Sequence, residues 1–213
     1  MPNYTDFMSF IKDKVPSRSI VSLDLETLVK QPGGFLSGER IIAVSMSYGL
    51  PDVKTEIFVA EDDSDREEYR ILNHANTLMR TIDPSVIIGY NHSGYDIPLI
   101  QIKIKKYPYD RKLRSLEYYL GTAWCLDMMY VISDDLAKDD GDRYIRKLDD
   151  VVIHDRYAKL DLKRVKGLAR RPGMNKGQAI EEMWKNDRDS FRSYCEGDTH
   201  DLLIILQDIL SSQ

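Results

Sequence analysis

The sequence predicts an α/β fold in which a mixed, five-stranded sheet is flanked by helices. Three alternating or β-branched stretches come first, over residues 19–27, 39–50 and 53–60, and read as strands joined by turns. Helix and strand patterns then alternate, with a helix over 64–81, a strand over 85–91 and a helix entered at Pro98. The chain ends in a long helix over about 188–210. This order of elements is typical of a mixed sheet with helices on its faces.

Two segments are harder to assign. Residues 123–132, "AWCLDMMYVI", fit a fifth strand or a short helix, because their periodicity does not decide between the two. Residues 143–190 are expected to be mostly helical, with a break at "RRPGMNKG". With 213 residues, of which 42% are hydrophobic, the chain can form one well-packed core. We therefore expect a single domain over 1–213, with residues 1–18 as an N-terminal extension.

Composition excludes several classes of protein. The net charge of −5 argues against a protein that coats nucleic acid, although residues 103–114 and 156–176 are locally basic. The only two cysteines, Cys125 and Cys195, lie far apart and indicate neither a disulfide framework nor a structural zinc site. The N-terminus lacks the apolar core of a signal peptide, and no stretch is long enough to span a membrane. We expect a soluble, cytoplasmic protein with no membrane partner.

The first predicted strand carries two acids on one face. In "VSLDLE" successive side chains alternate, so that Asp24 and Glu26 point the same way. Carboxylates held this close repel one another unless they share a proton or face a cationic side chain or a metal ion. A solvated strand end explains the pair equally well.

An acid also interrupts the apolar stripe of the last helix. Asp198 lies among Cys195, Leu202 and Leu206, where a lone carboxylate is costly to bury. Tyr194 precedes it by four positions and shares its face. A structural role would account for the tyrosine alone, whereas Asp198 requires a partner from elsewhere in the chain.

Two further polar residues follow the strand at 85–91. Asp96 stands at the start of a helix, where an acid commonly caps the helix or meets its dipole. Asn91 ends the strand, where asparagine is a common turn residue. Neither residue is specific evidence of a site by itself.

In order along the chain, these residues resemble a known family. "LDLET" (23–27), "GYNHSGYDIPLI" (89–100) and "YCEGDTHDLLIIL" (194–206) are similar to the three motifs of the DEDD 3′→5′ exonucleases. The likeness is to the proofreading exonuclease domains of family B DNA polymerases and their stand-alone relatives, and it spans about 19–210. The histidine form of the family has its histidine five positions before the final acid. Ser193 stands there in this chain, so Tyr194 indicates the DEDDy form.

The resemblance implies a ribonuclease-H-like fold and two divalent cations, Mg²⁺ or Mn²⁺, which prefer oxygen ligands. Asp24 would bridge both ions, Glu26 and Asp198 would complete the first site, and Asp96 would serve the second. Tyr194 would orient the attacking water, since a phenol is a poor base. The resemblance also implies that the terminal nucleotide is contacted by Thr27, Leu28 and Asn91.

The expected function is therefore metal-dependent 3′→5′ exonuclease action on single-stranded or frayed DNA. Alternatives are an exoribonuclease or oligonucleotidase with the same chemistry, and a non-catalytic nucleic-acid-binding accessory module. The expected partner is single-stranded nucleic acid, with DNA favoured over RNA, and a replication or repair protein is a further candidate. We expect an Asp198→Asn protein to lose activity but keep its stability, because removing charge relieves repulsion.

Further substrate contacts could come from aromatic and basic side chains, although core packing and solvated helix faces explain them as well. The candidates are Tyr107, Tyr109, Tyr118, Tyr119, Lys163, Lys166, Arg170 and Arg171.

Overall fold

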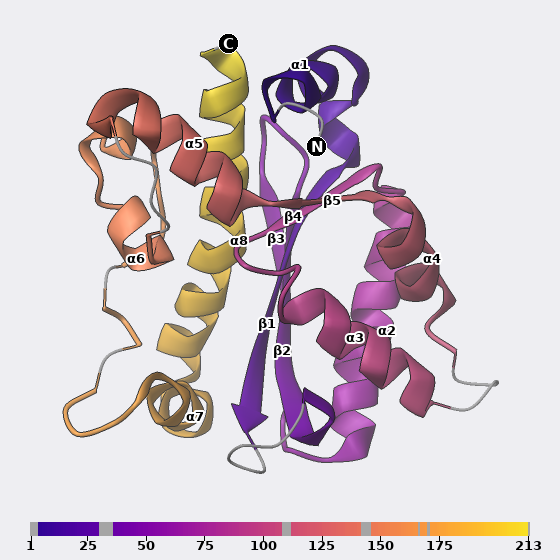
Figure 1. Ribbon diagram of the computed structural model, residues 1–213. Coiled ribbons are helices and arrows are strands. Elements are labelled where there is room, and N and C mark those ends of the chain that lie inside the picture. The colour runs from indigo at the N-terminus through magenta and orange to yellow at the C-terminus, as the bar shows by residue number, and fades with distance from the viewer. Residues whose placement is uncertain are drawn as a thin grey trace.

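The computed structural model describes residues 4–29, 36–107, 112–141, 146–165, 167–169 and 171–212. Over these residues the fold is α/β (Figure 1). The strands are β1 (Ile20–Val29), β2 (Glu39–Tyr48), β3 (Lys54–Val59), β4 (Val86–Gly89) and β5 (Trp124–Asp127). The α-helices are α1 (Tyr4–Lys14), α2 (Asp65–Ile82), α3 (Asp96–Lys106), α4 (Arg114–Thr122), α5 (Met128–Asp140), α6 (Leu148–Val151), α7 (Lys176–Asn186) and α8 (Arg188–Ser211).

The five strands form one sheet in the order β3-β2-β1-β4-β5. The pairs β1/β2 and β2/β3 are antiparallel, whereas β1/β4 and β4/β5 are parallel. The predicted mixed, five-stranded sheet is confirmed. The undecided segment 123–132 contains both structures, since β5 leads directly into α5 at Met128.

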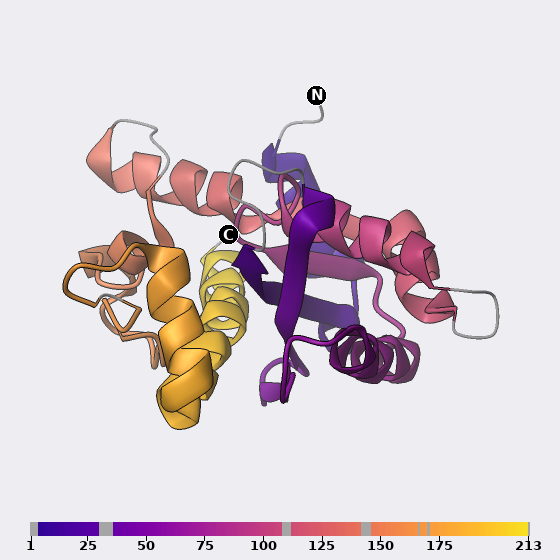
Figure 2. The same ribbon diagram turned by 90° about the horizontal axis from the view of Figure 1, so that it is seen from below.

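Helices cover both faces of the sheet. Helices α2, α3 and α4 lie on one side, and α7 and α8 lie on the other, with α5 and α6 beyond α8 (Figures 1 and 2). Val21, Leu23 and Leu25 of β1 are fully or almost fully buried in a cluster that includes side chains of α2. Because side chains alternate along a strand, the intervening Asp24 and Glu26 point to the face that α8 covers.

Buried hydroxyls attach α8 to this face. Ser45 Oγ donates to the carbonyl of Cys195 at 2.9 Å, and Thr199 Oγ1 lies 2.8 Å from the hydroxyl oxygens of both Ser45 and Ser47. Ser45 and Asp24 are direct partners across the β1/β2 ladder. These bonds therefore fix the position of α8 along the sheet. They place Asp198, the neighbour of Thr199, close to β1.

The expectation of a mostly helical segment over 143–190 is wrong for much of its length. Between residue 143 and the start of α7, the described residues contain only α6 and a short 3₁₀ helix, Asp155–Tyr157. Further along, the backbone N–H groups of Lys163 and Arg164 donate to the Asp201 carboxylate, each at 2.8 Å. This contact with α8 takes the place of bonds within a helix.

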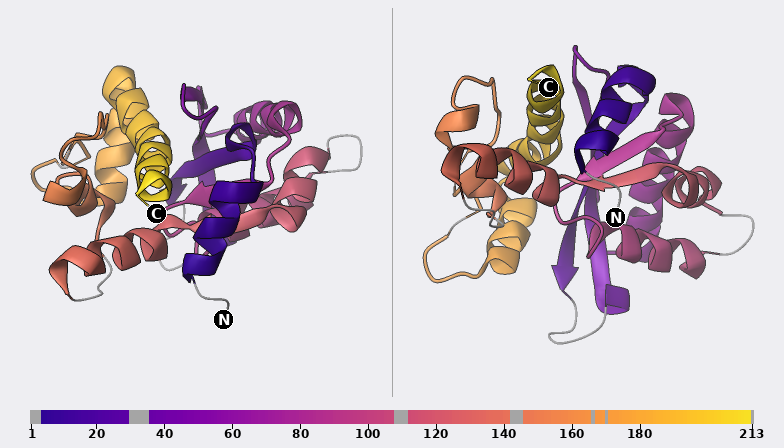
Figure 3. Two further views of the ribbon diagram at one scale, coloured as in Figure 1. Left: turned by 90° about the horizontal axis from the view of Figure 1, so that it is seen from above. Right: turned by 45° about the horizontal axis from the view of Figure 1, so that its top comes forward.

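The first and the last helix pack against one another. Met8 and Ile11 of α1 are buried in a cluster that contains Leu206 and Ile209 of α8. Seen from above, α1 lies beside the C-terminal part of α8 (Figure 3).

Helix α3 begins at Asp96, slightly before the expected entry at Pro98. Of the helices that the structure describes, none combines the length and apolarity required to cross a bilayer.

Candidate active site

Three carboxylates, two from β1 and one from α8, converge at the face between these two elements. Ligand oxygens of Asp24, Glu26 and Asp198 all lie within 4.8 Å of one another. They open on a cavity of about 300 Å³, which Asp96, Thr27 and Asn91 also line. The cavity thus brings together all four acids of the predicted set and two of the three residues expected at the terminal nucleotide.

A β-bulge shapes this part of β1. Glu26 pairs with Ala43, but Thr27 pairs with Ile41, so the register with β2 shifts between Glu26 and Thr27. In a regular strand these neighbours would point to opposite faces of the sheet. A bulge turns the strand and redirects side chains, which accounts for Glu26 and Thr27 lining the same cavity.

Asp96 reaches the cavity from the start of the helix that follows β4, the strand beside β1. It is the first residue of α3 and follows the short link after β4, which is parallel to β1. Burial raises the pKa of the Asp96 carboxyl well above its usual value, and the charges of Asp24 and Glu26 raise it further. The N-cap residue of α3 is Tyr95, so Asp96 does not serve as the N-cap.

Nearby cations offset only part of the cost of burying the two carboxylates of β1. Burial raises the pKa of Asp24 to about 6, against the lowering effects of Lys176 and Arg164. Burial raises the pKa of Glu26 to about 8, and the charge of Asp24 contributes. The buried Oδ2 atom of Asp24 has no hydrogen-bond partner among the described residues. A compact set of carboxylate oxygens lacking sufficient cationic partners fits a hard divalent cation.

Tyr194 is buried one turn before Asp198 on α8. Burial raises its pKa well above 10, and the nearby charge of Glu26 raises it further, so the phenol stays protonated at neutral pH. Two cations flank its ring. The Arg164 guanidinium carbon lies 5.0 Å from the ring centroid, and Lys176 Nζ lies 5.8 Å from it.

Sequence reasoning did not single out either of these two cations. Lys176 begins α7 and lines the acidic cavity. Arg164 forms ion pairs with Asp198 and with Asp149 of α6, the latter at 2.9 Å. The one available signal was the local excess of basic residues over 156–176, which does not single out either position.

Two basic cavities adjoin the acids. One, of about 390 Å³, is lined by Tyr194 together with the cations Lys147, Arg164, Arg171 and Lys176. The other, of about 490 Å³, has Asp24 and Asp198 in its wall and is lined by the cations Arg146, Lys147, Arg164 and Lys176. Negative and positive side chains therefore face adjoining spaces at this end of the sheet.

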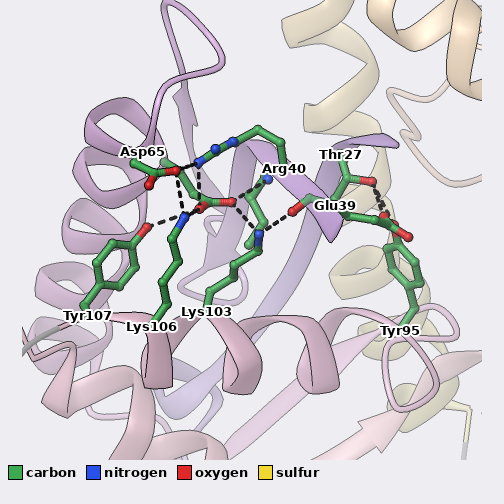
Figure 4. Close-up of polar contacts among 10 residues, drawn as sticks. Thr27, Glu39, Arg40, Asp65, Tyr95, Lys103, Lys106 and Tyr107 are labelled. Atoms are coloured by element: carbon green, nitrogen blue, oxygen red, sulfur yellow. Dashed lines mark hydrogen bonds and ion pairs between the residues drawn. The ribbon is translucent and has the colours of Figure 1, made fainter. Parts of the chain in front are cut away.

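The residues expected at the terminal nucleotide have different surroundings. The Thr27 hydroxyl bonds to Glu39 at 2.8 Å and lies 2.7 Å from the Tyr95 hydroxyl (Figure 4). Asn91 adopts a left-handed backbone, with φ of 59°, and its N–H donates to Asp127 at 2.8 Å. Leu28 differs, because it is 7% exposed within the core and does not line the cavity. The expected contact between Leu28 and the terminal nucleotide therefore stays a prediction, and Leu28 is not part of the cavity wall.

Most of the additional aromatic and basic candidates that the structure describes have structural contacts. The hydroxyls of Tyr107 and Tyr119 donate to Glu68 at 3.2 Å and to Asp83 at 2.7 Å, whereas Tyr118 is 61% exposed. Lys163 pairs with Glu196. Arg171 lines the 390 Å³ cavity. Outside the described residues lie Tyr109, Lys166 and Arg170.

Comparisons with known proteins bear on the fold and the family of the chain. A solved family B DNA polymerase from the hyperthermophilic archaeon Pyrobaculum calidifontis matches with a TM-score of 0.63 and 20% sequence identity. The match covers 90% of this chain and 24% of the polymerase, so the chain spans about a quarter of that protein. It confirms the ribonuclease-H-like exonuclease fold. A search among curated proteins found no match.

A family model decides the assignment. The model described as "DNA polymerase family B, exonuclease domain" matches residues 3–116, which is more than half of the chain and includes the first two acidic motifs. The chain therefore belongs to the family of exonuclease domains of family B DNA polymerases.

Proposed function

We propose that this protein is a DEDDy-type 3′→5′ exonuclease that hydrolyses single-stranded or frayed DNA from its 3′ end with the help of two divalent cations, Mg²⁺ or Mn²⁺. One observation carries the proposal: the oxygens of Asp24, Glu26 and Asp198 converge within 4.8 Å at a cavity that Asp96 also lines. Membership of the family of polymerase exonuclease domains supports the same chemistry.

The four acids would divide the work of binding the cations. Asp24, Glu26 and Asp198 would hold the first, while Asp24 and Asp96 would serve the second. Bound cations of this kind supply a nucleophilic hydroxide at neutral pH and stabilise charge on the attacking and leaving oxygens. The raised pKa values of Asp24 and Glu26 mean that protons compete for the same oxygens.

Tyr194 would orient the attacking water. Its raised pKa keeps the hydroxyl protonated near neutrality, so it can hydrogen-bond to water but is unsuited to remove a proton. Tyr194 belongs to α8, and its ring is buried close to Glu26. The water would therefore be positioned by the same helix that carries Asp198.

The adjoining basic cavities suit the backbone of the substrate. The cations that line them, Arg146, Lys147, Arg164, Arg171 and Lys176, could neutralise phosphates. Thr27 and Asn91, which line the acidic cavity, are placed to contact the terminal nucleotide. The preference for DNA over RNA is part of the proposal, and it depends on contacts near the 2′ position of the sugar.

The test is the digestion of matched 5′-labelled DNA and RNA single strands with and without Mn²⁺. The wild-type protein should shorten DNA stepwise from its 3′ end only with the metal. Asp24→Asn should slow the reaction on the order of 10³-fold, about 4 kcal/mol of transition-state stabilisation. Faster digestion of RNA would replace the DNA assignment and keep the mechanism.

A matched control is Asp135→Asn, which removes another buried carboxylate. Asp135 belongs to α5 and bonds to the Tyr157 hydroxyl at 3.0 Å, outside the acidic cavity. At a temperature where all variants remain folded, this control should retain activity. Wild-type rates in folded Asp24→Asn would refute the proposed mechanism.

A further inference from the structure

The Arg164 side chain enters the acidic cluster, although it belongs to none of the three sequence motifs. It is 7% exposed. Its Nε donates to Asp149 Oδ1 at 2.9 Å, and its Nη1 pairs with Oδ1 of Asp198. Its guanidinium carbon lies 5.0 Å from the centroid of the Tyr194 ring. One cation therefore contacts both a candidate metal ligand and the tyrosine of the site.

The backbone of Arg164 is fixed by residues that flank Asp198 on α8. The fully buried Asp201 carboxylate accepts the N–H of Arg164 at 2.8 Å. On the other side of Asp198, a Cβ on Gly197 would lie 2.8 Å from the Cα of Arg164, so the absence of a side chain allows this close approach. Helix α8 thus holds Arg164 by its backbone as well as by its guanidinium.

The ion pair and a bound cation place conflicting demands on Asp198. A divalent cation held by Asp198 requires a carboxylate oxygen as a ligand. Oδ1 of Asp198 is engaged by Arg164. A divalent ion at that oxygen would also stand close to a guanidinium of the same sign of charge, which costs energy in a poorly solvated site. Full engagement of Asp198 by both cations is therefore unfavourable.

We propose that Arg164 is an internal counter-ion that competes with the divalent cation for Asp198, so that cation binding requires Arg164 to release this carboxylate. The inference rests on the cation site of the proposed function. In the metal-free protein, Arg164 offsets repulsion among Asp24, Glu26 and Asp198. After release, its guanidinium keeps Asp149 as a partner and faces the basic cavities, which it lines with Lys147 and Lys176.

The competition can be measured without any nuclease assay. Mn²⁺ is titrated by calorimetry into the wild-type protein and into Arg164→Gln at one pH and one salt concentration. We expect Arg164→Gln to bind Mn²⁺ about tenfold more tightly, which equals about 1.4 kcal/mol. Its metal-free form should unfold at a lower urea concentration. A purely structural role for Arg164 predicts looser Mn²⁺ binding, so the sign decides.

Arg156 provides a matched control, because it repeats the arrangement away from the acidic cavity. It pairs with Asp135 at 3.2 Å and with Asp208 at 2.5 Å, and its guanidinium carbon lies 5.2 Å from the Tyr157 ring centroid. Arg156→Gln should also lower the stability of the protein. It should leave the Mn²⁺ dissociation constant unchanged, because Arg156 contacts none of the candidate ligands.

A second measurement covers the case in which Arg164→Gln does not fold. The wild-type protein is labelled with ¹⁵N-arginine and titrated with Mg²⁺, and the Nε–H resonance of Arg164 is assigned by its loss in Arg164→Lys. This resonance should shift in proportion to metal occupancy, while that of Arg156 stays in place.

Equal or weaker Mn²⁺ affinity in folded Arg164→Gln would overturn the inference. An Arg164 resonance that does not move at Mg²⁺ saturation would also overturn it, as would an absence of metal binding by both proteins. Tightened binding by a protein without nuclease activity would support the inference and refute the proposed function alone. The two failures are therefore distinguishable.

Discussion

The hydroxyl of Ser45 lies 2.8 Å from that of Thr199, and this buried pair ties β2 to α8 beside the acidic cluster. Ser45 is the strand partner of Asp24, while Thr199 follows Asp198 directly. The two hydroxyls therefore link the elements that carry opposite sides of the candidate cation site. A change to this pair should affect both stability and the geometry of the acids.

Thr199→Val tests this link, because it removes the hydroxyl with little change of shape. Loss of a buried hydrogen-bond partner should lower the free energy of unfolding by about 1–3 kcal/mol. Activity should fall as well, since Asp198 is then held less firmly in its position relative to β1. Urea denaturation and the rate of strand digestion measure the two effects. The control is Thr77→Val on α2, whose exposed hydroxyl bonds only to its own helix, at 3.0 Å to Asn73, and which should change neither quantity appreciably.

Asp198→Asn should behave differently from the expectation that sequence alone produced. That expectation treated the charge of Asp198 as purely repulsive, but the carboxylate pairs with Arg164. The variant should lose nuclease activity and also become less stable without metal, because removing one partner of a buried ion pair leaves the other charge poorly compensated. Asp24→Asn should relieve repulsion and be at least as stable as the wild-type protein. Urea denaturation in the presence of EDTA compares the two, and equal stability of Asp198→Asn and wild type would contradict the role given to the ion pair.

Glu68 should make the stability of the protein sensitive to acid. Burial by itself would raise the pKa of this carboxyl, but the N–H of Ile41 and the ammonium of Lys103, at 3.0 Å each, lower it below its usual value of 4.5. Arg40 and Lys106 complete the cluster (Figure 4). A carboxylate with a lowered pKa contributes stability that is present above its ordinary pKa and is lost as the pH falls.

The matching variant is Glu68→Gln, which leaves Lys103 buried without its main anionic partner. It should cost about 3–5 kcal/mol at pH 7, as expected for a broken buried ion pair. The difference from wild type should shrink as the pH is lowered below about 5, because the wild-type carboxyl then takes up its proton. Urea denaturation between pH 3 and pH 7 measures this trend. Glu117→Gln, at an exposed position on α4, is the control, and a pH-independent difference for Glu68→Gln would contradict the linkage.

Local patterns predicted the parts of the site that depend on one element at a time. The shared face of Asp24 and Glu26 follows from strand alternation, and the inward position of Asp198 follows from helical spacing. Arg164 was missed because its position depends on Asp201 and Gly197, which lie on another element. The same tertiary contacts explain why a helix was wrongly expected around Lys163.

Long-range effects also account for the remaining differences. The resemblance implied that Leu28 contacts the substrate, but in the folded chain this residue is buried in the core. The bulge after Glu26 depends on the pairing with β2, and nothing in "LDLET" alone indicates it. Lys176 lies at the start of α7, within the break that the sequence indicated at "RRPGMNKG". A short motif therefore predicts which of its own residues face the cavity, and predicts less well which neighbours surround them.

Gly197→Ala should separate helix propensity from tertiary contact. Alanine in place of glycine inside a helix ordinarily stabilises a protein by about 0.5–1 kcal/mol. At position 197, however, the new Cβ would lie 2.8 Å from the Cα of Arg164 and 2.9 Å from its Cβ, which the backbone cannot accommodate without moving. We expect a net loss of about 1–3 kcal/mol, as for other overpacked sites. Gly121→Ala on α4 is the matched control, because its added Cβ would meet no atom of the described residues within 4 Å apart from its chain neighbours and its own helix backbone, and it should be neutral or stabilising. Urea denaturation of both variants gives the comparison, and a stabilised Gly197→Ala protein would show that α8 and the Arg164 segment are not in the close contact described.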